Sequence, residues 1–207
     1  MVSEMITVGK SEIRKDAWEK VTGRALYTAD IPIEGVRFGR IYRSPHHHAR
    51  IVRIDTSKAK ALSGVVGVIT AEDIPGRKTF GPIFQDRPPL AIEKVRHAGE
   101  PIAIVVAVDP DVADRALELI EIEYELLPAV FDPRTALAPD APKVHHQGNL
   151  LISYNVSSGD VQAGFSESDV ILEETFTVPR ISPAYLETES ALAYWSDNET
   201  LTVWVSS

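Results

Sequence analysis

Histidines and carboxylates are the side chains of this 207-residue sequence whose types and spacing could support chemistry. Three histidines are consecutive at residues 46–48, and two more, His145 and His146, are adjacent. Imidazole nitrogens are common ligands of zinc and other transition metals. Neighbouring side chains on an extended chain point to opposite sides, however, so adjacent histidines rarely bind one metal ion together. We therefore expect both groups to lie in turns or at the surface, and we assign no metal ligand.

Two glutamates form the other candidate group. Glu187 and Glu189 would share one face of a strand, because alternate side chains of a strand point the same way. A buried pair of this kind could do acid–base work, but a solvated strand face explains the spacing equally well. Asp160, which follows Gly159, is expected only to cap a turn. The sequence has no glycine-rich phosphate-binding loop, nucleophile elbow or HExxH motif, so it carries no complete catalytic motif.

The segment from Val95 to Pro128 predicts the fold most clearly. Residues 102–108 are a continuous apolar run, mostly β-branched, which is typical of a strand covered on both faces. Asp109 followed by Pro110 is a strong helix start, because the carboxylate accepts an unpaired amide and proline has none to leave unpaired. Apolar residues then recur at helical spacing, at Ala113, Leu117 and Ile120. From Glu121 to Leu126 the period changes to two, which predicts a second strand.

Similar patterns earlier in the chain predict strands and a short helix, at residues 38–43, 49–55 and 65–69 and at 57–62 respectively. Two mixed units of this kind predict an α+β fold, with helices packed on small mixed sheets. Between the units lies a connection at residues 76–96, and loops beyond about 12–15 residues tend to be functional or mobile. It contains Phe80, Ile83 and Phe84, so we expect it to be held against an apolar surface. The alternative is that these side chains only cover the edge of the local core.

A proline-rich stretch from Leu127 to Gly148, here called the strap, is predicted to connect two domains. After it, apolar residues predict strands at 170–178, 186–195 and 201–205, with a hairpin turn at Asp197 and Asn198. The expected organisation is an N-terminal arm with a first domain, then a linker, then the start of a truncated β-rich domain, at residues 1–127, 128–148 and 149–207.

Composition excludes several functional classes. The net charge is -9 with scattered lysines and arginines, which argues against a nucleic-acid-binding surface. The absence of cysteine excludes disulfides and cysteine-ligated iron–sulfur clusters within this sequence, and it fits a cytoplasmic setting. No apolar run approaches the roughly 20 residues of a membrane span, and the first residues lack signal-peptide features. We therefore expect a cytoplasmic protein that contacts neither nucleic acid nor membrane.

Five blocks of the sequence, in this order, carry a family resemblance: GKSEIRKDAWEKVTGRALYTADI, RIYRSPHHHARIVRIDTSKA, HAGEPIAIVVA with the stretch ending in EYELLP, SSGDVQAGFSESDVILEETF, and YLETESALAYW. Together they resemble the start of the molybdenum-binding subunit of the xanthine dehydrogenase and aldehyde oxidase family. The loop FGPIFQDRPPLA is most similar to that of bacterial xanthine dehydrogenases acting on purines. The resemblance implies an α/β hammerhead domain from about Asp16 to Leu127, and a molybdopterin-binding region beyond about Gly148.

What the resemblance implies for the full-length protein is a molybdenum hydroxylase that takes its oxygen from water. In this family a molybdenum-bound hydroxide, deprotonated by a glutamate, attacks a carbon beside a ring nitrogen or an aldehyde carbon. Hydride passes to a molybdenum sulfido group. Electrons then leave through iron–sulfur clusters to FAD, both on partner subunits or domains. The sequence does not separate purine, other heterocycle and aldehyde as the substrate.

The match stops before the family's catalytic groups. The strand resembling Leu201–Ser207 runs into a cofactor-contacting glutamine in the family, and the glutamate base lies further downstream. The resemblance therefore implies a fragment without turnover, in which Glu187 is structural and no residue is catalytic or cofactor-binding. The segment of the family that lines the substrate funnel matches the loop at Pro82, Ile83 and Phe84. These three residues are our substrate-channel candidates.

The alternative is a non-catalytic assembly module. Under the enzyme hypothesis, the expected partners are the remainder of the same subunit, iron–sulfur and flavin subunits, and a small heterocycle or aldehyde. We expect the isolated chain to hold no molybdenum cofactor. We also expect it to self-associate, because strands without neighbours leave unpaired edges and apolar surface.

Overall fold

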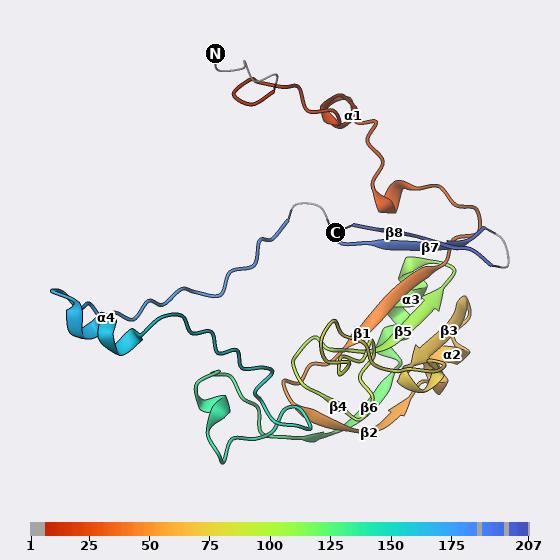
Figure 1. The fold of residues 1–207 in the computed structure, drawn as a ribbon. Helices are drawn as coiled ribbons and strands as arrows, with labels where there is room; N and C mark the ends of the chain where they lie inside the picture. Colours follow the sequence, from red (N-terminus) through yellow and green to blue (C-terminus); the bar gives the residue numbers. More distant parts are fainter. Residues whose placement is uncertain (1–6, 186–187, 197–198, 207) are drawn as a thin grey trace. The chain divides into compact units, whose positions relative to one another are not determined.

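The computed structural model describes residues 7–185, 188–196 and 199–206, and the chain forms two compact units (Figure 1). Residues 35–168 form the larger unit, whereas residues 1–34 and 169–207 form the smaller one. Glu187 and the turn expected at Asp197 and Asn198 lie outside the described residues. In the part of the chain that is described, no helix is both long enough and apolar enough to cross a membrane.

Two three-stranded sheets build the larger unit, and all of their pairings are antiparallel. The first sheet contains, in spatial order, β1 (Phe38–Arg43), β5 (Pro101–Ala107) and β3 (Val65–Thr70). The second contains β4 (Lys94–Val95), β2 (Ala49–Asp55) and β6 (Glu121–Leu126). The strands predicted in this part of the chain are therefore confirmed, and β4 is a short addition to them.

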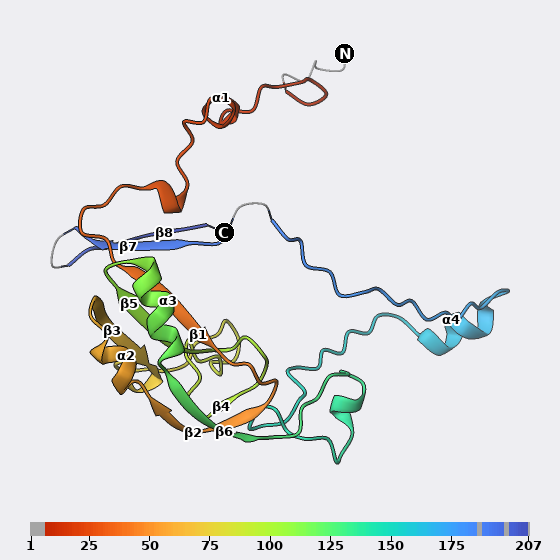
Figure 2. The same cartoon turned by 180° about the vertical axis from the view of Figure 1, so that it is seen from behind.

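Two helices cover the first sheet. Helix α3 (Pro110–Glu118) lies against β1 and β5, and α2 (Ser57–Ala61) lies against β3 and touches α3 (Figure 2). The residues where they meet the sheet are mostly small and fully buried: Ala59, Ala103, Ala107, Ala113 and Ala116. Small side chains let the helices approach the sheet closely, so close contact between backbones contributes to this core as much as large side chains do.

The predicted helix start at Asp109 is confirmed. The Asp109 side chain accepts hydrogen bonds from Asp111 N at 2.8 Å and Val112 N at 3.4 Å, and Pro110 occupies the first helical position. A similar cap occurs at Asp160, whose carboxylate accepts from Ala163 N at 3.0 Å. Asp160 therefore begins a helix, α4 (Val161–Glu167), where the sequence indicated only a turn.

Short helices and one hairpin form the regular structure of the smaller unit. Its arm contains α1 (Ala17–Val21) and η1 (Thr28–Asp30), and its hairpin pairs β7 (Ala191–Trp195) with β8 (Leu201–Val205). Residues of η1 lie against β7. One face of the hairpin is entirely apolar, because the register places three residue pairs on it: Ala191 with Val205, Ala193 with Val203, and Trp195 with Leu201.

The strand expected at residues 170–178 is not formed. This stretch has no helix or strand assignment, and its large apolar side chains are exposed. Alternating apolar residues favour a strand, but a strand also needs a hydrogen-bonded neighbour, and none of the described residues pairs with this stretch. Two further 3-10 turns, η2 (Ala71–Asp73) and η3 (Thr135–Leu137), lie in the larger unit.

Candidate functional site

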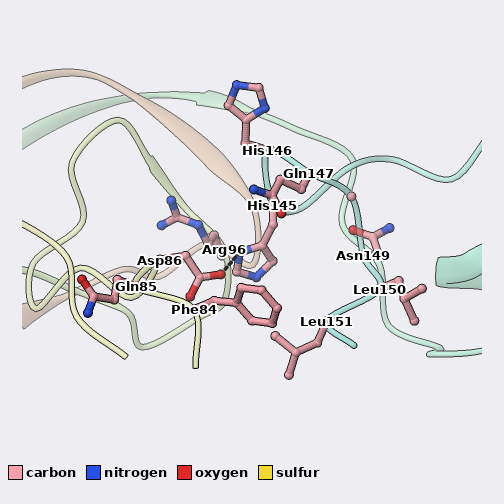
Figure 3. Close-up of a pocket in the computed structure, with 11 residues that line it drawn as sticks. Phe84, Gln85, Asp86, Arg96, His145, His146, Gln147, Asn149, Leu150 and Leu151 are labelled. Carbon is pink, nitrogen blue, oxygen red and sulfur yellow. Dashed lines mark ion pairs between the residues drawn. The ribbon is translucent and has the colours of Figure 1, made fainter. Parts of the chain in front are cut away.

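A pocket of about 430 Å³ lies in the larger unit, between the long loop and the end of the strap (Figure 3). Its first wall consists of Phe84, Gln85, Asp86 and Arg96, and its second wall consists of residues 145–151. In the chain, Phe84 to Asp86 follow β3, Arg96 directly follows β4, and the second wall follows β6. Residues about 60 positions apart are therefore brought together by the loops that leave the two sheets.

The loop of the first wall is closed on itself. Phe80 and Arg87 exchange two backbone hydrogen bonds, of 2.9 and 3.0 Å, and the Arg87 guanidinium lies 5.7 Å from the centre of the Phe80 ring. Gly81 fits only because it has no side chain, since a Cβ there would lie 1.8 Å from the carbonyl oxygen of Phe84. The close approach of the Phe84 carbonyl therefore requires glycine at position 81.

The second wall is fixed by one side chain. Asn149 Oδ1 accepts a hydrogen bond from Val144 N at 2.9 Å, and Asn149 Nδ2 donates to Ala136 O and Pro142 O, both at 2.9 Å. Gly148 N also donates to His145 O at 3.1 Å. Because both Nδ2 hydrogens and Oδ1 of Asn149 are engaged in these bonds, its role in the pocket is to shape the backbone.

One polar contact joins the two walls. His145 Nδ1 lies 3.8 Å from Asp86 Oδ2, with both side chains about half exposed, as the dashed line in Figure 3 marks. An exposed pair of this kind contributes less than about 1 kcal/mol even when the histidine is protonated. The contact therefore joins the two walls only weakly.

The positive charge of Arg96 is neutralised by a buried carboxylate behind the first wall. Arg96 Nη1 donates to Glu100 Oε1 at 3.1 Å, and Glu100 also accepts from Arg96 N. Glu100 is only 6% exposed, so this ion pair is shielded from water. The pocket thus offers an aromatic face, amide and imidazole hydrogen-bonding groups, and no strongly cationic well.

Only one of the three substrate-channel candidates lines the pocket. Phe84 does, whereas Pro82 and Ile83 lie at the exposed tip of the same loop. The expectation that the loop is held against an apolar surface is not met among the described residues, because Phe80, Ile83 and Phe84 are 52%, 64% and 41% exposed. The loop is held by its own backbone bridge instead.

The consecutive histidines lie in the turn between β1 and β2, and each makes a different contact. The His46 ring meets Tyr124 edge-on at 4.8 Å, and the His47 ring meets Phe131 edge-on at 5.0 Å. His48 is 5% exposed, and its Nδ1 lies 2.7 Å from Pro128 O. The turn was expected from the sequence, but the burial of His48 was not. The only signal for it was its position directly before the buried Ala49 of β2.

No cluster of three histidine, cysteine or acidic residues that could hold a metal ion is found in the described ranges 7–185, 188–196 and 199–206. His145 and His146 line the pocket, apart from His46 to His48. Glu189 is exposed, and its expected companion Glu187 is not described. The assignment of no metal ligand stays a prediction.

Comparisons with known proteins identify a family with the same domain. Residues 22–128 match the family model of the aldehyde oxidase and xanthine dehydrogenase a/b hammerhead domain, which is more than half of the chain. The chain belongs to the aldehyde oxidase and xanthine dehydrogenase family. Residues 144–207 match the molybdopterin cofactor-binding domain. The family resemblance and the hammerhead α+β fold expected from the sequence are thereby confirmed.

Curated relatives cover nearly all of the chain. It is 40% identical to a probable xanthine dehydrogenase subunit of Bacillus subtilis, over 97% of this chain and 27% of that protein. It is 38% identical to the nicotinate dehydrogenase large molybdopterin subunit of Eubacterium barkeri, over 96% of this chain and 47% of that protein. The chain therefore spans about a quarter to a half of the length of these relatives.

Solved structures agree with this assignment. The aldehyde oxidoreductase of Desulfovibrio gigas matches with a TM-score of 0.82 and 31% identity, over 93% of this chain and 23% of that one. The quinoline 2-oxidoreductase of Pseudomonas putida 86 matches with a TM-score of 0.78 and 31% identity, over 95% of this chain and 26% of that one. The relatives and structural neighbours named here are oxidoreductases or their subunits.

Members of this family use molybdenum-molybdopterin, which needs an enclosed site with groups that bind it. Within residues 144–207, the side chains of the stretch 152–185 are almost entirely exposed to solvent. The cationic side chain of the pocket, Arg96, is already paired with Glu100. The residues described here do not fit the cofactor by themselves, and we assign none of them to it.

Proposed function

We propose that this chain forms the hammerhead domain and the beginning of the molybdopterin-binding region of a molybdenum hydroxylase subunit. The observation that carries the proposal is the order of the two family matches, at residues 22–128 and 144–207, along one chain. These matches also support the proposed division into a first domain, a linker and a second domain, at residues 1–127, 128–148 and 149–207. The holoenzyme would hydroxylate purines, related heterocycles or aldehydes.

Within that enzyme, we propose that the chain acts as scaffold and as one wall of the substrate channel. Pro82, Ile83 and Phe84 present apolar surface on a loop that the backbone bridge between Phe80 and Arg87 closes. A fixed apolar edge favours a flat, partly apolar substrate over a strongly charged one. The named activities of the relatives, xanthine and nicotinate dehydrogenases, support a nitrogen heterocycle as the substrate class.

The proposed partners follow from the same relatives. We propose that the remainder of the subunit holds the molybdenum-molybdopterin, and that iron–sulfur and FAD-carrying subunits or domains take the electrons. The absence of cysteine supports placing iron–sulfur clusters outside this sequence. It also supports the cytoplasmic setting, which remains a proposal.

A second candidate is an assembly module without catalysis. It is favoured by one observation, which is the apolar face of the β7–β8 hairpin, because exposed apolar faces are typical of association surfaces. Under this alternative, a complex that contains the chain would show no hydroxylation of any heterocycle or aldehyde. The loop at Pro82 to Phe84 would then be free to vary without effect on catalysis.

The decisive experiment replaces Phe84 in the assembled holoenzyme. The Phe84→Ala variant should lower kcat/KM for a heterocyclic substrate by about tenfold, because a lost apolar contact in a substrate site is worth about 10–200-fold. Molybdenum content should stay unchanged. Val66→Ala, at an exposed apolar residue of β3 outside the pocket, is the control and should leave kcat/KM unaltered. Equal kinetics for both variants would refute the channel role.

A further inference from the structure

The pocket between the long loop and the strap has a carboxylate on its first wall, and this group is only weakly paired. The Asp86 side chain points toward His145 across the pocket, and its Oδ2 atom lies 3.8 Å from His145 Nδ1 (Figure 3). That separation is longer than a hydrogen bond. A neutral imidazole has no charge to offset that of a carboxylate, and histidine is ordinarily neutral at about pH 8. Both side chains are about half exposed, so Asp86 remains accessible from the pocket.

The arginines around the pocket are engaged by other groups. Arg96 lines the pocket and pairs with the buried Glu100 at 3.1 Å. Arg77 does not line the pocket, and it donates to Gln85 Oε1. The Arg87 guanidinium lies 5.7 Å from the centre of an aromatic ring of its own loop. Among the described residues that line the pocket, the charge left without a close partner of opposite sign is therefore the negative charge of Asp86.

This charge and the apolar face beside it define what the pocket can accept. An ionised carboxylate only accepts hydrogen bonds, so Asp86 suits a ligand with a ring N–H or an amino group. The Phe84 ring lines the same pocket and offers a surface for a flat ring. A ligand that carries a carboxylate would bring a second negative charge close to Asp86, where the repulsion is only partly weakened by water.

We propose that Asp86 is a specificity-determining residue, which disfavours anionic heterocycles and accepts a hydrogen bond from uncharged heterocycles that bear a ring N–H or an amino group. The inference rests on the proposed function, because the pocket must lie on the path of the substrate. It narrows the substrate class from nitrogen heterocycles in general to uncharged ones. Phe84 supplies apolar contact to any flat ring, whereas Asp86 distinguishes rings by their charge. The two positions should therefore have separable effects.

The test compares nicotinate with nicotinamide, because the two compounds share a pyridine ring and differ in a carboxylate against an uncharged amide. Inhibition constants for both are measured on the assembled holoenzyme at about pH 8, where histidine is ordinarily neutral. The reaction followed is the oxidation of the heterocycle that the enzyme turns over fastest, so neither compound needs to react. The unaltered enzyme should bind nicotinamide more tightly than nicotinate.

In the Asp86→Asn variant, the preference for nicotinamide should fall by about tenfold, because the repulsion of one half-exposed charge is removed. Asp86→Glu keeps the charge and should keep the preference. Asp111→Asn removes an exposed carboxylate of α3 outside the pocket, and it is the matched control that should leave the preference unchanged. Phe84→Ala should weaken the binding of both compounds alike.

The dependence on salt separates charge selection from a change of shape. Raising the salt concentration from about 0.02 M to about 0.5 M screens exposed charges, so it should reduce the preference of the unaltered enzyme. The Asp86→Asn variant should respond much less, because the screened charge is absent. A carboxylate that only shaped the loop would give the same salt response in both enzymes.

Two results would overturn the inference while the channel role stands. One is an unchanged preference in Asp86→Asn when Phe84→Ala weakens both compounds, and the other is an unaltered enzyme that binds nicotinate more tightly. If neither variant changes any inhibition constant, the pocket is not on the path of the substrate, and the channel role fails as well. A holoenzyme that oxidises no heterocycle or aldehyde refutes the proposed function itself, which differs from an active enzyme with an unchanged preference.

Discussion

Replacing Asn149 with alanine should open the strap while both sheets of the larger unit stay folded. The Asn149 side chain makes three hydrogen bonds of 2.9 Å, to Val144 N, Ala136 O and Pro142 O. Each such bond contributes a net of about 0.5–1.5 kcal/mol. The site is half-buried, which favours the lower part of that range, so closure of the strap should weaken by about 2 kcal/mol.

The assay compares local with global opening. A loss of about 2 kcal/mol corresponds to about a thirtyfold fall in amide protection, which should appear at Val144 and not in β5. Neither core cluster contains a residue of the strap, so the urea midpoint of the sheets should change little. Asn155→Ala, at an exposed asparagine, is the matched control. Unchanged protection at Val144, or a global loss equal to the local one, would refute the reasoning.

Four further predictions follow from other contacts. Gly81→Ala should displace the Phe84 backbone, because the new Cβ would lie 1.8 Å from Phe84 O; NMR shifts confined to the loop at 80–87 would verify this. Ile102→Ala removes a fully buried side chain and should lower the unfolding free energy by about 2–5 kcal/mol in urea titrations, whereas the exposed Ile83→Ala should not. Hydrogen bonds from Arg14 and then Lys20 lower the pKa of Asp16 to about 2. The stability that this carboxylate adds to the arm is therefore present above about pH 4 and is lost as pH falls toward 2. In the Arg14→Ala variant, the titration midpoint of Asp16 measured by NMR should move toward 3.8. The apolar hairpin face should make the chain self-associate, and a monomer in sedimentation across a wide concentration range would contradict this.

Local signals in the sequence predicted the elements of the larger unit well. The start of α3 could be predicted because Asp109 and Pro110 act on the amides directly beside them. The strand at 102–108 could be predicted because both of its faces are buried within one domain. Such signals need no knowledge of what lies elsewhere in the chain.

The partition into two sheets could not be predicted in the same way. Strand β5 pairs with β1 and β3, whereas β6, which follows it after one helix, pairs with β2 in the other sheet. This choice depends on contacts between residues far apart in sequence, which periodicity does not encode. The failure at 170–178 has the same origin, because alternation describes a strand's faces and not its neighbour.

The pocket was the least predictable feature, and the physical reason is its dependence on single hydrogen bonds between loops. Phe84 could be selected for its family resemblance, but nothing in its neighbourhood indicates that His145 and Asn149 lie across from it. The fold and the pocket also differ in how they are stabilised. Closely packed alanines under α2 and α3 hold the first sheet, and changing them should destabilise it.

The walls, in contrast, depend on Gly81 and Asn149, neither of which belongs to a core cluster. A change at either position can therefore alter the pocket with little effect on the stability of the sheets. Under the proposed function, such an arrangement would let the pocket change while the scaffold stays constant. It also means that stability measurements alone will miss the residues that matter for the pocket, whereas exchange at Val144 and Gly148 will detect them.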